Sequence, residues 1–107
     1  HDVFWPQYAE RCMFCTDDKH PSDLLEKGHI DYIAREAINK YGVDPIIAVK
    51  AACHHASRYF LLNNRGAIAP GARADLCVWD ADHPATVPYH YGGQRPSQVV
   101  IAGDLVP

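Results

Sequence analysis

The chain has 107 residues and a formal net charge of −3; 48% of its residues are hydrophobic and 21% are charged. These values are typical of a globular protein rather than a disordered one, and the negative charge, with no cluster of lysine and arginine, argues against a nucleic-acid partner. No apolar run approaches the roughly 20 residues that a membrane span requires, and no signal-peptide pattern opens the chain.

The four cysteines are Cys12, Cys15, Cys53 and Cys77. An even number in a short chain allows a disulfide framework, but three of them lie in apolar runs. Free cysteine is among the most buried residue types, so we expect buried thiols in a reducing compartment, the cytoplasm. Cys12 and Cys15 form a Cys-x-x-Cys pair, but its spacing from the histidines downstream does not match a common zinc finger.

The apolar run of residues 12–15 ends in Thr16 and two adjacent carboxylates, Asp17 and Asp18. It predicts a buried strand over about residues 11–16. In a parallel barrel, catalytic side chains lie at the C-terminal ends of strands, and alternate side chains point in different directions. One aspartate can then serve a metal and the other a substrate. The alternative is a solvated turn that caps the next helix.

Three helices are predicted between residues 22 and 59. Ser22 is a suitable N-cap for a short helix over residues 23–27, which Gly28 ends. A longer helix follows over about residues 29–41, because its apolar side chains recur at the spacing of one buried stripe. These side chains are Ile30, Ile33, Ala34, Ala37, Ile38 and Tyr41.

The third helix begins after Asp44, its N-cap, has Pro45 at its first position and runs to about Tyr59. Its many alanines predict close packing against a neighbouring element. His54 and His55 lie in its last half, where a positive charge suits the helix dipole. We interpret this pair as packing or capping residues rather than as metal ligands.

The pattern changes after the third helix, which predicts a boundary near residues 61–70. Strands are expected over residues 74–80 and 97–102, and a turn at residues 103–104. Residues 82–96 are rich in proline, glycine, histidine and tyrosine and predict an irregular loop.

Residues 66–80 carry the most specific signature, Gly-Ala-Ile-Ala-Pro-Gly-Ala-Arg-Ala-Asp-Leu-Cys-Val-Trp-Asp. This stretch resembles the C-terminal G-x-I-x-P-G-x-x-A-D-L-x-x-x-D motif of the metal-dependent amidohydrolase superfamily. Residues 49–60 and 99–106 resemble the helix that leads out of the barrel and the final strand pair of those enzymes. The resemblance implies an α/β fold, in which residues 1–60 are the last strand and helices of a (β/α)₈ barrel and residues 61–107 are part of a small β-sandwich domain.

Within this superfamily, residues 14–21 together with residues 23–33 look most like the bacterial adenine deaminases. The resemblance implies that Asp17 matches the aspartate at the end of the eighth barrel strand, which ligates the metal and takes the proton of the metal-bound hydroxide. Asp18 matches the next position, which in related purine deaminases faces the base.

The same resemblance leaves two roles open for Lys19, His20, Glu26 and His29, which either shape the pocket or are solvated and capping residues. Asp75, which lies within the C-terminal motif, is expected to be structural.

Deaminating adenine at C6, to hypoxanthine and ammonia, requires a hydroxide at neutral pH, which a divalent metal supplies by lowering the pKa of bound water. It also requires a carboxylate that moves the proton to the ring and then to the leaving ammonia. The resemblance therefore implies Asp17 as metal ligand and catalytic residue, Asp18 as a substrate-binding residue, and Mn or Fe rather than Zn as the metal.

Most ligands of such a metal have no counterpart in this sequence. The superfamily pattern requires a His-x-His on the first strand, a bridging carboxylate or lysine, and two further histidines, and a (β/α)₈ barrel needs about 250 residues. The chain also begins at His1, and its only methionine is Met13. We therefore expect a piece of a longer enzyme that is inactive by itself.

Two alternatives to a C-terminal part of an adenine deaminase-like enzyme stay open. One is a small standalone α/β module that binds or assembles without catalysis; the other is an amidohydrolase acting on another cyclic amidine or amide. If the helices belong to a barrel, part of their apolar surface should be exposed here, or covered by self-association or by the missing N-terminal part. The residues concerned are Ile30, Ile33, Ile38, Ile46, Ile47 and Val49.

Overall fold

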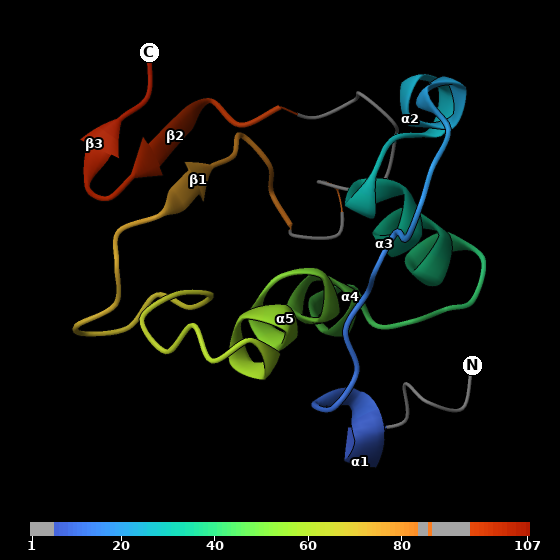
Figure 1. The fold of residues 1–107 in the computed structure, drawn as a ribbon, viewed down its shortest axis with the longest axis horizontal. Helices are drawn as coiled ribbons and strands as arrows, with labels where there is room; N and C mark the ends of the chain where they lie inside the picture. Colours follow the sequence, from blue (N-terminus) through green and yellow to red (C-terminus); the bar gives the residue numbers. More distant parts are fainter. Residues whose placement is uncertain (1–5, 84–85, 87–94) are drawn as a thin grey trace.

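The computed structural model describes residues 6–83, 86 and 95–107 (Figure 1). Within this part of the chain, helices come first and a small sheet follows. The elements are α1 (Pro6–Ala9), α2 (Pro21–Lys27), α3 (Ile30–Asn39), α4 (Pro45–Ala52), α5 (His54–Tyr59), β1 (Leu76–Val78), β2 (Gln98–Ile101) and β3 (Asp104–Leu105). None of these helices is both long and apolar enough to cross a membrane. The expected loop over residues 82–96 lies mostly outside the described residues.

The segment of residues 12–16 forms neither a strand nor a helix, so the strand predicted there is wrong for this chain. A strand needs a neighbouring strand, and the strands that the structure describes all lie later, between residues 76 and 105. Instead, the segment is hydrogen-bonded to a helix. The N–H of Phe14 donates to the carbonyl of Ala51 in α4 at 2.9 Å.

The helix starts follow local chemistry, with one correction. Asp44 caps α4 as predicted, because its Oδ1 accepts from the N–H groups of Ile46 at 2.9 Å and Ile47 at 3.2 Å. The predicted N-cap at Ser22 is wrong: α2 begins at Pro21, one position earlier. Proline suits the first position of a helix because its missing N–H leaves no donor unsatisfied there.

The third predicted helix is divided at Cys53 into α4 and α5. Both histidines that follow the break bind main-chain carbonyls outside the helix. His54 Nδ1 donates to the carbonyl of Gly66 at 3.1 Å, and His55 Nδ1 donates to the carbonyl of Cys12 at 2.8 Å. These bonds connect the helix to the neighbouring chain, and His55 is the buried polar side chain of the described core.

Small side chains form the core. The buried apolar residues are Ala9, Ala34, Ala37, Ala48 and Ala51, and the last two have no exposed surface. They let α3 and α4 pack closely, as the alanine content predicted. No large side chain of the described residues is fully buried. Ile46 is 43% exposed and the other five residues of the predicted apolar surface are half-buried, which confirms their partial exposure.

The three strands form an antiparallel sheet in the order β1-β2-β3 (Figure 1). Cys77 pairs with Val99, and Val100 pairs with Leu105. The turn between β2 and β3 has positive φ at Ala102 and Gly103, as a two-residue hairpin requires, so it lies one residue before the predicted turn. All three residues of β1 are exposed, so this strand has no covered face within the described structure.

Asp75 holds the start of the sheet together, which confirms its structural role. Its Oδ1 accepts from the N–H of Ala102 and from Nε of Arg73, each at 2.9 Å, and Arg65 Nε lies 3.9 Å from its Oδ2. The main-chain hydrogen bond from Ala102, followed by the charges of Arg73 and Arg65, lowers the pKa of Asp75 below its usual value.

The four cysteines, all among the described residues, form no disulfide bond, but the prediction that they are buried is wrong. Cys12 is half-buried, while Cys15, Cys53 and Cys77 are exposed. Burial of an apolar run requires a second layer to cover it. The loop that carries Cys15 and the exposed strand β1 that carries Cys77 have no such layer in the described structure.

Candidate functional site

The two aspartates singled out by sequence, Asp17 and Asp18, lie in the loop between residues 12–16 and α2, and both are exposed. Asp17 has a φ of +53°, in the left-handed region that aspartate enters more readily than most residues. Within the part of the chain that the structure describes, neither carboxylate makes a hydrogen bond or an ion pair. Both are therefore free to bind a ligand.

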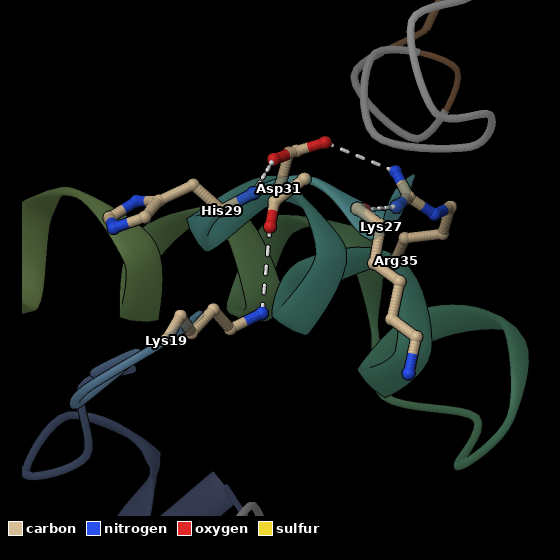
Figure 2. Close-up of polar contacts among 6 residues, drawn as sticks. Lys19, Lys27, His29, Asp31 and Arg35 are labelled. Atoms are coloured by element: carbon tan, nitrogen blue, oxygen red, sulfur yellow. Dashed lines mark hydrogen bonds and ion pairs between the residues drawn. The ribbon is translucent and has the colours of Figure 1, made fainter. Parts of the chain in front are cut away.

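The residues on either side of this pair are anchored to the connection between α2 and α3. On one side, Thr16 Oγ1 and His29 Nε2 share a hydrogen bond of 3.1 Å. On the other side, Lys19 Nζ donates to the carbonyl of Gly28 at 3.5 Å and lies 4.7 Å from the centre of the Tyr32 ring. Figure 2 shows Lys19 reaching from its loop to this connection.

The connection itself is fixed by Asp31 and Arg35 (Figure 2). Asp31 Oδ1 accepts from the N–H of His29 at 2.8 Å, and its Oδ2 binds Arg35 Nη1 at 3.2 Å. Arg35, whose side chain is only 11% exposed, also donates to the carbonyl of Lys27 at 2.6 Å. Burial raises the pKa of Asp31, but the N–H of His29 and the Arg35 guanidinium outweigh it, so the pKa lies below its usual value.

The sequence left the role of four residues open. Lys19 and His29 both take part in the hydrogen bonds between the aspartate-bearing loop and the α2–α3 connection, whereas His20 and Glu26 do not. His20 and Glu26 are exposed. Sequence reasoning missed Asp31 and Arg35. Their spacing of four residues on a predicted helix was the available signal, since such pairs of opposite charge face one another.

No group of three or more histidine, cysteine, aspartate or glutamate side chains among the described residues is placed to hold a metal ion. The Asp17 carboxylate is suited to be one ligand of a hard divalent cation, because such ions prefer oxygen ligands. One carboxylate does not make a metal site, however. The described residues therefore supply part of a ligand set at most.

A pocket of about 460 Å³ lies beside α3. It is lined by Phe14, Tyr32, Ile33, Glu36, Ala37, Lys40, Tyr41 and Val43. Most of these side chains are apolar or aromatic, and neither Asp17 nor Asp18 is among them. The pocket is a groove on the helices rather than a substrate site around the aspartates.

Comparison of the sequence with known protein families places the chain in a class. Residues 7–106 match the sequence profile of the Amidohydrolase family, and the chain belongs to that family. The resemblance inferred from residues 66–80 is confirmed.

Particular relatives are named adenine deaminase. The chain is 57% identical over 67 residues to the adenine deaminase of Kosmotoga olearia, which is 63% of this chain and 11% of that protein. It is 53% identical over 72 residues to that of Desulfatibacillum aliphaticivorans, covering 67% and 12%, and 49% identical over 75 residues to that of Nitratidesulfovibrio vulgaris, covering 70% and 13%. The chain thus spans about an eighth of the length of these curated relatives. No solved structure matches it significantly.

Proposed function

We propose that the chain is part of an adenine deaminase-like enzyme that hydrolyses adenine to hypoxanthine and ammonia. The observation that carries this proposal is the 49–57% identity to proteins named adenine deaminase over 63–70% of the chain. The family match over residues 7–106 supports it. The proposal places the protein in the cytoplasm, where its four cysteines would stay reduced.

In this proposal Asp17 is a metal ligand and the group that moves a proton to the purine and then to ammonia. Its carboxylate is exposed and has no partner among the described residues, so it is available for both tasks. A divalent metal held in part by Asp17, Mn or Fe in preference to Zn, would supply hydroxide at neutral pH. Asp18, the next residue, forms a hydrogen bond to the base and fixes its orientation.

The remaining ligands come from a part of the enzyme outside this sequence. Large apolar side chains of the described residues, among them Leu25, Ile46 and Phe60, are exposed. This exposed apolar surface supports packing against further protein. It is consistent with residues 1–60 completing a (β/α)₈ barrel and residues 61–107 completing a β-sandwich.

The test measures ammonia release from adenine by the full-length protein that contains this chain, with Mn²⁺ added. We expect Asp17→Asn to lower kcat by a factor of about 10² to 10⁴, because it removes a proton acceptor and a charged ligand. Asp18→Asn should mainly raise KM for adenine. Asp82→Asn is the matched control, because Asp82 is exposed and is not part of this loop.

The result also separates the alternatives. Full activity of Asp17→Asn would contradict the role of Asp17. Faster ammonia release from another cyclic amidine than from adenine would identify a different amidohydrolase. Absence of hydrolysis with any such substrate would favour a binding or assembly module without catalysis.

A further inference from the structure

The side chains on both sides of the aspartate pair are hydrogen-bonded to one short segment, residues 27–31, which we call the clamp turn. Thr16, directly before the pair, bonds His29 at 3.1 Å, and Lys19, directly after it, bonds the carbonyl of Gly28 at 3.5 Å. The two bonds fasten side chains that flank the pair and leave the Asp17 and Asp18 carboxylates exposed.

The clamp turn is itself held by one carboxylate. Asp31 accepts from the N–H of His29 at 2.8 Å and pairs with Arg35 at 3.2 Å, and Arg35 closes the turn on the carbonyl of Lys27 at 2.6 Å (Figure 2). Because Arg35 is mostly buried, this ion pair is screened by solvent less than a surface pair would be.

Gly28 is required at the centre of the clamp turn for two reasons. Its φ is +97°, which residues with a side chain rarely adopt. A Cβ at this position would also lie 2.7 and 2.8 Å from the two carboxylate oxygens of Asp31. A side chain at position 28 would therefore have to displace the Asp31 carboxylate from its place in the clamp turn.

We propose that the clamp turn positions the Asp17–Asp18 pair, with His29 and Asp31 as positioning residues that act through Thr16 and the Gly28 backbone. This inference rests on the proposed function. A left-handed φ is uncommon even for aspartate, and the two flanking bonds favour the loop conformation in which Asp17 adopts it. The function of the clamp turn is to keep two unpaired carboxylates in a fixed geometry.

Two variants test the clamp turn in the full-length protein. Thr16→Val keeps the shape of the side chain but removes its hydroxyl, and Gly28→Ala drives a Cβ into the Asp31 carboxylate. Each has a matched control. Thr16→Ser keeps the hydroxyl, and Gly42→Ala also has a positive φ, of +67°, but its Cβ would meet nothing within 4 Å.

Three quantities are measured: amide hydrogen exchange of residues 16–19, Mn²⁺ affinity by titration, and kcat and KM for adenine. We expect Thr16→Val and Gly28→Ala to speed exchange at residues 16–19, and to weaken Mn²⁺ binding and lower kcat by about tenfold each, with KM little changed. Thr16→Ser and Gly42→Ala should keep the wild-type exchange at residues 16–19, Mn²⁺ affinity and kcat.

Unchanged exchange at residues 16–19 in both clamp variants would overturn the inference, and so would faster exchange spread evenly over α3 and α4, which would indicate a merely structural role. If the wild-type protein neither binds Mn²⁺ nor releases ammonia, the proposed function fails. The exchange of residues 16–19 still decides whether the clamp turn holds the loop.

Discussion

Asp17 has a backbone conformation that most residues avoid, and its carboxylate is the group that the proposed chemistry needs. We expect Asp17→Gly to fold at least as stably as the wild-type chain, because glycine adopts φ of +53° without strain. Asp17→Val should lower the free energy of unfolding by about 1–2 kcal/mol, since a β-branched side chain is disfavoured there. Urea unfolding measures both. Equal stability of the two variants would show that the backbone at this position carries no strain.

Asp75 gives the chain a defined acid sensitivity. Because its pKa is lower in the folded state than the ordinary 3.8, the ionised group stabilises the fold above that pH. This contribution is lost as the pH falls below 4 through the folded pKa. We expect the urea midpoint of the wild-type chain to fall more between pH 6 and pH 3 than that of Asp75→Asn. Parallel midpoints for the two proteins over this range would contradict the prediction.

At the scale of elements, the loop that follows α5 is attached to that helix at Gly66. Gly66 and Gly71 both have a positive φ, but only Gly66 faces a neighbour: its Cβ would lie 2.7 Å from Ser57 Cβ and Oγ. We expect Gly71→Ala to cost about 1–2 kcal/mol from backbone strain alone. Gly66→Ala should cost about 1–3 kcal/mol more because of the clash. Thermal unfolding of the two variants measures this difference, and equal melting temperatures would exclude the contact.

Elements with local signals were predictable from the sequence, and elements that depend on distant partners were not. The Asp44 cap and the alanine-rich face of α4 follow from neighbouring residues, and the structure has both. The expected strand at residues 11–16 needed a partner strand that the described chain does not place beside it. At the candidate site, the aspartate pair was found from its position after an apolar run. The bond from Thr16 to His29 was missed, because it joins residues 13 positions apart.

At the scale of the whole molecule, the packing resembles one side of an interface. The fully buried side chains of the described residues are alanines, and large apolar residues lie partly or largely in solvent. Ile46 shows this on α4, where it is 43% exposed. The described residues therefore have exposed apolar area that further protein can cover.

We therefore expect the isolated chain to self-associate as its concentration rises, and Ile46→Lys to weaken this association by placing a charge on the exposed apolar surface. Sedimentation of the chain measures the association. Ser22→Lys, which adds the same charge at an exposed position on α2, is the control and should behave as the wild type does.

In the full-length protein we expect Ile46→Lys to lower the free energy of unfolding. If further protein covers Ile46, the substitution replaces a buried apolar side chain by a charged one, which is costly to bury. If the isolated chain stays monomeric and Ile46→Lys does not change the stability of the full-length protein, the prediction is wrong and this surface is exposed to solvent in the native protein.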